Sequence, residues 1–264
     1  MEFDAEALKA AIRSALAGWQ DDLVAAARFL TRLPLGSLET SRSRPLAVVM
    51  RAFPLVGILV GLAGWAVFAL ATALGLPALI AGLLAVATTV AVTGGLHEDG
   101  LADTADGFGG GAELERKLAI MRDSRSGTYG VLALVFSVAL RAAALATLTS
   151  PRAGLALIAA HAVSRAFLPM VMRRLESARE DGLGVAAGQP DDAAIGWCLA
   201  IALVMALFCL GVGSGLLGLI VAAAAVAALA ALARGQIGGY TGDVLGAAQQ
   251  IGEIAMLLTA AAAA

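Results

Sequence analysis

Charged and aromatic residues are scarce in this sequence. Only 14% of its 264 residues are Asp, Glu, Lys or Arg, whereas soluble domains carry about 25%. Aromatic residues account for 5%, and no stripe of Lys and Arg accompanies them, so no nucleic-acid partner is expected. The N-terminus is acidic and amphipathic without an apolar core, which argues against a cleaved signal peptide.

Cysteine is nearly absent as well. Cys198 and Cys209 both fall within one apolar run. We interpret them as small hydrophobic residues, because nothing near them completes a metal site or requires a disulfide.

Hydrophobic residues are abundant instead, at 60% of the chain, and the mean hydropathy is +0.87. Apolar segments of the length that crosses a bilayer, about 20 residues, recur along the chain. They predict an all-α, polytopic integral membrane bundle of about seven transmembrane helices, with small residues at its helix contacts, such as Gly57 and the tight 211–215 connection. The predicted spans are approximately 52–74, 77–95, 129–149, 153–172, 194–213, 215–233 and the short 250–264.

The first 45 residues are predicted to form an amphipathic cytoplasmic or interfacial segment ahead of a transmembrane catalytic domain, 46–264. Helical periodicity in residues 1–33 gives a broad apolar face that includes Leu8, Trp19 and Phe29. One or two helices are expected here, either on the membrane surface or packed against the bundle from the cytoplasmic side.

Lys and Arg residues orient the predicted bundle. They gather in the N-terminal segment and in the loops 96–128 and 173–193, whereas the opposite connections hold only Arg152. By the positive-inside rule, the N-terminus and these loops are cytoplasmic. Arg141 and Arg165 lie inside apolar segments, so each is expected to pair with a buried carboxylate or to bind an anionic substrate.

An acidic stretch from His97 to Gly107 carries the clearest chemical signal. Asp99, Asp103 and Asp106 are spaced by four and then three residues, which puts them on one face of a helix. Like charges this close repel unless a cation binds between them, and hard carboxylate oxygens suit Mg²⁺. A solvated acidic turn is the alternative.

A basic stretch precedes the third predicted span. Arg122 and Arg125 are three residues apart and can bind phosphate oxygens, while the Thr128 hydroxyl and nearby backbone N–H groups add donors. Anchoring of the chain at the cytoplasmic surface is the alternative.

A third polar stretch, 238–243, contains Thr241 and Asp243 among glycines, and Asp243 can bind a metal or act as a base. Acidic, basic and glycine-rich stretches are thus predicted at one face of one bundle. This combination indicates transfer of a phosphate-linked group, in which a metal and arginines hold phosphates and a carboxylate acts on the attacking hydroxyl.

In three places the chain resembles the cobalamin synthase family, also called adenosylcobinamide-GDP ribazoletransferases. The shared motifs are H-x-D-G-L-A-D-x-x-D-G at 97–107, R-D-S-R-x-G-T-x-G at 122–130 and T-G-D-x-L-G-A at 241–247. The resemblance runs in order through nearly the whole chain from about residue 20, and the long first motif is specific.

The resemblance implies a multi-pass enzyme of the bacterial inner membrane that acts late in vitamin B12 assembly. Such an enzyme joins adenosylcobinamide-GDP to α-ribazole or its 5′-phosphate, releases GMP and needs Mg²⁺. A ribose hydroxyl attacks the phosphate that stays on the corrinoid. Which ribazole form is used, and whether the protein forms a homo-oligomer, are left open.

Roles within this reaction are assigned from residue chemistry. The candidate metal ligands are Asp99, Asp103 and Asp106. The candidate catalytic residues are these three together with His97, which would orient the hydroxyl or a metal-bound water unless it is structural, and Asp243. The candidate substrate-binding residues are Arg122, Asp123, Arg125, Thr128, Arg165 and Thr241.

One position departs from the family pattern. Where two glutamates are expected, the chain has Gln250 and then Glu253. A glutamine forms hydrogen bonds but cannot serve as a base or a charged ligand. Asp243 is therefore favoured over position 250 for a catalytic role.

Two other functions would show different sequence patterns. A CDP-alcohol phosphotransferase carries D-G-x-x-A-R, but here Ala102 comes one position too early and Asp103 follows it. An ion-coupled transporter would place ionisable residues near the bilayer midplane and show a repeat between its halves, and neither pattern is found.

Overall fold

The computed structural model describes residues 5–35, 45–182 and 186–264, with side chains from Gly18 onward. The predicted division of the chain after residue 45 directly follows residues 36–44, which the structure does not describe. The division stays a prediction.

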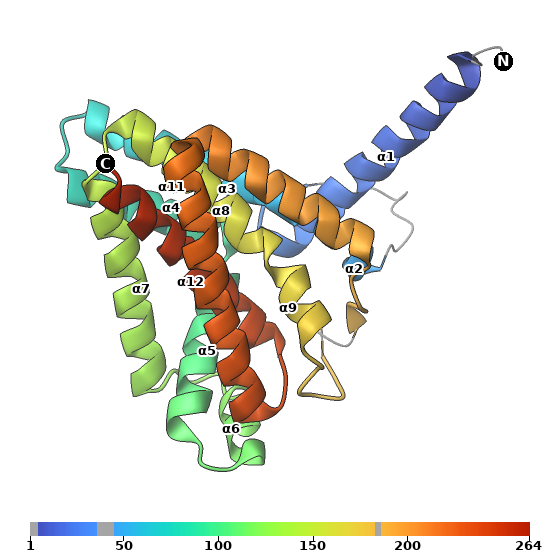
Figure 1. Ribbon diagram of the computed structural model, residues 1–264. Helices are drawn as coiled ribbons and strands as arrows, with labels where there is room; N and C mark the ends of the chain where they lie inside the picture. The colour runs from blue at the N-terminus through green and yellow to red at the C-terminus, as the bar shows by residue number, and fades with distance from the viewer. Residues whose placement is uncertain (1–4, 36–44, 183–185) are drawn as a thin grey trace.

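The described chain is helical throughout and forms one bundle (Figure 1). Apart from one isolated bridge between Ser177 and Tyr240, these residues contain no β-structure. The helices are α1 (Ala5–Leu30), α2 (Leu46–Val49), the 3₁₀ helix η1 (Met50–Ala52), α3 (Phe53–Ala73), α4 (Ala78–Thr93), α5 (Leu96–Gly110), α6 (Leu114–Ile120), α7 (Thr128–Ala146), α8 (Ser150–Ala166), α9 (Leu168–Arg174), α11 (Asp192–Ile237) and α12 (Gly242–Ala262).

Helices of membrane-spanning length and hydropathy confirm the predicted fold class. The five that qualify alone are Leu46–Ala73, Thr128–Ala146, Ser150–Arg174, Asp192–Ile237 and Gly242–Ala262. A sixth span arises if α4 and α5, bent by 93°, are one broken span. The bend lies at Gly94 and Gly95, whose φ values of 67° and 70° are ones that glycine adopts without strain.

The helix α11 accounts for two predicted spans. Its helical backbone is interrupted at Gly211, whose φ of 76° and ψ of 171° are not helical. A Cβ on Gly215 would lie 2.6 Å from the carbonyl oxygen of Ala206, whereas these positions would be about 13 Å apart along a straight helix. The two arms of α11 therefore fold back on each other (Figure 1, orange). The arms correspond to the predicted spans 194–213 and 215–233, which together fall in one of the five helices of membrane-spanning length.

The helix α8 lies at the centre of the bundle and packs closely along α3. A Cβ on Gly61 would come within 2.8 Å of the α8 backbone at Ile158, and one on Gly57 would overlap the carbonyl of His161. Small residues permit this approach between membrane helices. The prediction that Gly57 lies at a helix contact is confirmed.

The C-terminal half of α1 packs against the bundle. Trp19 meets Trp197 of α11 edge to face at 5.3 Å, and Phe29 stacks on Phe53 of α3 at 5.9 Å. Of the two predicted arrangements, packing against the bundle is the one adopted by these residues. The side chain of Leu8 lies outside the described part.

Candidate active site

The first and third motifs meet where α5 crosses α12. A Cβ on Gly100 would lie 2.7 Å from the Asp243 carbonyl oxygen, and one on Gly246 would lie 3.2 Å from the Gly100 Cα. Backbones can approach this closely only where side chains are absent. The crossing places Asp99 and Asp103, on α5, beside Asp243 in the first turn of α12.

These carboxylates form a cluster with excess negative charge. Asp99 is exposed, whereas Asp103 and Asp243 are half-buried. The charges that act most strongly on Asp103 are three carboxylates, Asp99, Asp243 and Asp106, against one guanidinium, Arg179. Such a cluster favours a bound cation, because repulsion between carboxylates opposes their ionisation together.

Arg179 is a site residue that the sequence did not single out. Its Nη2 lies 3.4 Å from Asp243 Oδ2, and it donates to the Leu118 carbonyl at 3.4 Å. The bridge between Ser177 and Tyr240 holds this loop beside α12. From the sequence, Arg179 was one of several cytoplasmic arginines, and no spacing distinguished it.

Alanine at position 100 is expected to disrupt the cluster. The new Cβ of Gly100→Ala meets backbone, which cannot rotate away, so α5 and α12 must separate at a cost of about 1–3 kcal/mol. We expect both a lower thermal midpoint in detergent and lower transferase activity. Gly235→Ala is the matched control, because nothing lies within 4 Å of its Cβ position. Equal behaviour of the two variants would contradict the role of the crossing.

Asp106, predicted as a metal ligand, has backbone donors for both oxygens. Oδ2 accepts from Gly127 N–H at 2.6 Å and Oδ1 accepts from Gly130 N–H at 2.9 Å. These N–H groups begin α7, where helical N–H groups lack intrahelical partners and a negative charge is favoured. Asp106 therefore caps α7 and fixes the second motif to the first, a role that the sequence did not indicate.

Arg122 and Arg125 lie on the surface with carboxylate partners. Arg122 Nη2 lies 2.5 Å from Asp181, and Arg125 Nη2 lies 2.6 Å from Asp123. Hydrogen bonds from Arg125 lower the pKa of the Asp123 carboxyl to about 2. Exposed pairs like these contribute little to stability, so a phosphate can replace either carboxylate at little cost.

Asp123, Arg125 and Thr128 line one hollow of about 230 Å³, together with Asp106. Three predicted substrate-binding residues are thus brought together next to α5.

Thr241 lies at the start of α12. It is 3% exposed and caps α12, accepting from Val244 N–H at 3.3 Å. Its hydroxyl also donates to Asp243 Oδ2 at 3.1 Å. Thr241 thus orients the carboxylate of Asp243, and its contact with substrate stays a prediction.

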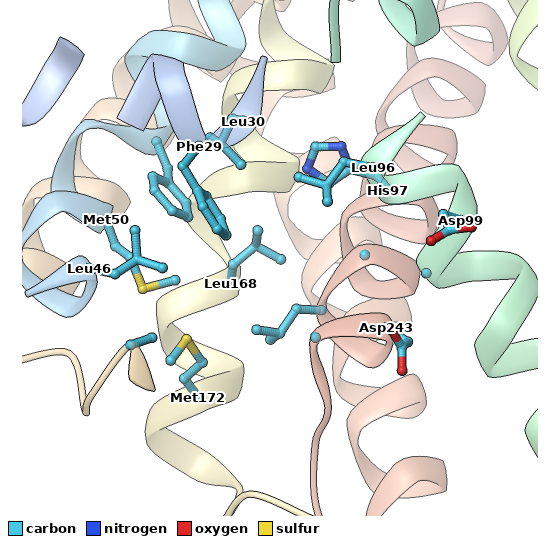
Figure 2. A pocket seen from close by; sticks show the side chains of 16 residues that line it. Phe29, Leu30, Leu46, Met50, Leu96, His97, Asp99, Leu168, Met172 and Asp243 are labelled. Atoms are coloured by element: carbon cyan, nitrogen blue, oxygen red, sulfur yellow. The ribbon is translucent and has the colours of Figure 1, made fainter. Parts of the chain in front are cut away.

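A pocket of about 270 Å³ lies beside the carboxylate cluster. Figure 2 shows Asp99 and Asp243 on one side of it and apolar side chains on the other. The apolar wall comes from four parts of the chain and includes Phe29, Leu30, Met50, Phe53, Leu168 and Met172.

His97 also lines this pocket. It is 3% exposed, and its Nε2 has no hydrogen-bond partner among the described residues. The His97 side chain therefore forms part of the pocket wall, while its Nε2 atom is enclosed by protein.

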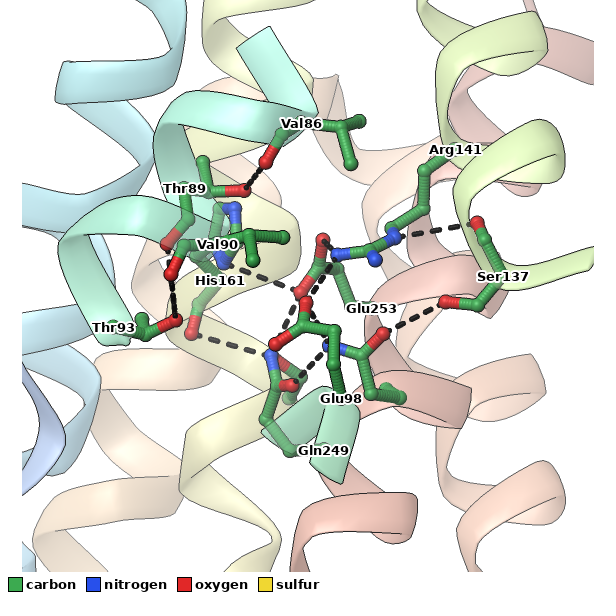
Figure 3. Close-up of polar contacts among 12 residues, drawn as sticks. Val86, Thr89, Val90, Thr93, Glu98, Ser137, Arg141, His161, Gln249 and Glu253 are labelled. Carbon is green, nitrogen blue, oxygen red and sulfur yellow. Dashed lines mark hydrogen bonds and ion pairs between the residues drawn. The ribbon is translucent and has the colours of Figure 1, made fainter. Parts of the chain in front are cut away.

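Arg141 belongs to a polar network deep in the bundle (Figure 3). Its Nη1 lies 3.0 Å from Glu98 Oε1 and 3.2 Å from Glu253 Oε1. Of the two predicted alternatives, pairing with buried carboxylates is the one found.

Arg165, predicted to bind substrate, lies in the same network. It is 1% exposed, and its Nη1 is 3.0 Å from His161 Nδ1. His161 Nδ1 in turn lies 3.3 Å from Glu253 Oε2. The guanidinium Nη1 therefore has partners within the chain, and Arg165 lines none of the pockets described here, so the structure places it in the buried network.

Gln250 is a further member of this network. Its Nε2 donates to Glu98 Oε1 at 3.0 Å, and its Oε1 accepts from Ser137 at 2.8 Å. A glutamate here would add a carboxylate beside Glu98 and lose the donor. The neutral amide therefore suits this network, and position 250 lies outside the pocket.

Within the described residues, no three His, Cys, Asp or Glu side chains form a metal site by themselves. Magnesium does not need one, because one or two carboxylates commonly hold it together with substrate phosphates. Asp99, Asp103 and Asp243 offer oxygen donors of this kind beside the pocket.

Taken together, the fold and site define a multi-pass helical membrane enzyme with an acidic cluster, a pocket and arginines suited to group transfer at phosphate. The chain belongs to the cobalamin-5-phosphate synthase family, whose model matches residues 22–261, and it is a transferase of cobalamin biosynthesis. The resemblance found in the sequence is confirmed.

Several relatives are named adenosylcobinamide-GDP ribazoletransferase. The chain is 50% identical over 242 residues to that of Bradyrhizobium diazoefficiens, covering 91% of this chain and 93% of the relative. It is 50% identical over 247 residues to that of Azorhizobium caulinodans, covering 90% and 94%. With that of Mesorhizobium japonicum it shares 48% over 245 residues, covering 92% and 93%. No solved structure matches the chain.

Proposed function

We propose that this protein transfers the phosphate-linked cobinamide of adenosylcobinamide-GDP to α-ribazole or α-ribazole 5′-phosphate and releases GMP. The names of its relatives support this reaction. The observation that carries it is the carboxylate cluster beside a pocket whose other wall is apolar.

The pocket suits the nucleoside acceptor. The bicyclic aromatic base of a ribazole would lie against the apolar wall, and its ribose would face the carboxylates. His97, whose side chain lines the pocket, would contact the ribose. Asp243, oriented by Thr241, would take the proton of the attacking hydroxyl.

The cluster and the arginines suit the diphosphate of the donor. Asp99 and Asp103 would hold Mg²⁺ together with the donor phosphates, whose charge the metal neutralises when bound. Arg122 and Arg125 would exchange their exposed carboxylate partners for phosphate oxygens. The hydroxyl oxygen forms a bond to the corrinoid-linked phosphorus, the bond between the two phosphates breaks, and GMP leaves with that electron pair.

The enzyme is proposed to lie in the bacterial inner membrane with its N-terminus and active face in the cytoplasm. The excess of Lys and Arg in 96–128 and 173–193 supports this orientation. Both loops reach the carboxylate cluster, through Asp103 and Arg179.

Product analysis tests the reaction. The purified protein in liposomes would receive adenosylcobinamide-GDP with α-ribazole or its 5′-phosphate, with and without Mg²⁺. We expect GMP and a cobalamin product in equal amounts, and neither after removal of the metal by EDTA. Release of CMP from a CDP-alcohol in parallel samples, without any cobalamin product, would contradict the proposal.

A further inference from the structure

A second groove, of about 360 Å³, runs between the α8–α9 segment and the second arm of α11. On one side it is lined by Phe167, Val171 and Arg174. These residues are four and then three positions apart, so they form one continuous helical face. Leu168 and Met172 of the same helix line the candidate active site instead, so the two cavities lie on different faces of α9.

The opposite side of the groove is one face of α11, with Ala223, Ala227 and Arg234. The two walls run in the same direction. Both begin at one end of the bundle, where Leu148 and Leu210 line a common hollow. Both then run towards the bridge that joins 177 to 240. The arginines that end each wall therefore lie at the same end of the groove.

These two arginines are the charged residues of the groove, and no carboxylate lines it. Arg174 and Arg234 are exposed, and neither guanidinium has an ion pair or hydrogen bond to any described residue. The adjacent Arg173 differs, because its Nη2 lies 3.4 Å from Asp192. Two unpaired guanidiniums at one end of an apolar groove are complementary to a ligand with an anionic head and a hydrocarbon tail.

We propose that this groove binds one anionic phospholipid, with its phosphate between Arg174 and Arg234 and an acyl chain along the apolar walls. Both walls belong to membrane-spanning segments, 150–174 and 192–237, so lipid surrounds the groove. Arginine at the end of a span reaches the headgroup level while its aliphatic part covers apolar surface. Clustered basic residues in this position attract anionic headgroups.

Lipid binding to the purified full-length protein tests the proposal. After delipidation in detergent, the protein is titrated with phosphatidylglycerol or with phosphatidylcholine of the same chains, and bound lipid is counted by native mass spectrometry. We expect phosphatidylglycerol to bind roughly tenfold more tightly, and the double variant R174Q/R234Q to lose this preference. R173Q is the matched control and should retain it.

A second pair of variants tests the acyl part without changing charge. Ala227→Trp fills the groove and should abolish binding of phosphatidylglycerol, whereas Ala228→Trp, on the neighbouring exposed position outside the lining, should not. Equal affinity for both lipids, retention of the preference in R174Q/R234Q, or equal binding by the two Trp variants would overturn the proposal. So would displacement of phosphatidylglycerol by inorganic phosphate at similar concentration, because the site would then recognise only a free anion.

Discussion

Replacing Asp103 by asparagine is expected to lower GMP release by about 100-fold or more. Asp103 is a half-buried member of the cluster, and the charges of Asp99 and Asp243 act on it more strongly than those of other residues. The amide keeps the size of the carboxyl group but removes the charge that would hold a cation against the diphosphate, and loss of one such electrostatic contact commonly costs 10²–10³ in rate, about 3–4 kcal/mol. GMP release is measured with saturating Mg²⁺ and both substrates.

The control for this variant is Asp192→Asn, an exposed aspartate whose side chain is paired only with Arg173 in the described structure. It should leave GMP release unchanged. If the two asparagine variants turned over at the same rate, Asp103 would lie outside the reacting centre. A transporter, in which the acidic face has no part in metal-dependent turnover, would then regain support.

Replacing Arg141 by leucine is expected to destabilise the bundle strongly. The change leaves Glu98 and Glu253 buried without their shared guanidinium. Breaking a buried pair in this way costs about 3–5 kcal/mol, which corresponds to a fall of roughly 10 °C in the thermal midpoint for a domain of this size. Thermal unfolding in detergent measures it.

Two further variants show whether charge is the cause. The double change R141L/E253Q removes one of the two unpaired buried carboxylates. It should therefore have a higher thermal midpoint than Arg141→Leu alone. Arg152→Leu removes an exposed cation from α8 and should shift the midpoint by about 2 °C or less. An effect of Arg152→Leu as large as that of Arg141→Leu would show that loss of arginine in general, and not the buried network, is responsible.

Sequence reasoning predicted the elements well because their signals are local. Runs of apolar residues gave the spans, and glycines marked the reversal at Gly211, whereas the bend at Gly94 and Gly95 was not predicted. Each of these features depends on residues within one or two helical turns of one another.

The partners of the polar residues could not be predicted in the same way. The spacing of Asp106 predicts its helical face correctly, but its backbone donors at Gly127 and Gly130 lie on another helix. The same limit applies to Arg165. An intramembrane cation requires a partner, but the sequence cannot show whether that partner is a substrate or His161. Arg179 carried no local signal at all, because only the folded chain brings it to Asp243.

The contact between Gly100 and Gly246 has a thermodynamic consequence. It fixes the distance between the helices through backbone atoms, so the carboxylates carried by the two helices stay close to one another. Without a bound cation, repulsion among these carboxylates therefore lowers the stability of the folded protein. A bound cation removes this repulsion, so binding at the cluster is linked to stability. A ligand present at 100 times its dissociation constant adds about 2.7 kcal/mol to the stability of the folded state, so the Mg²⁺ proposed for the reaction would also stabilise the packing of the two helices.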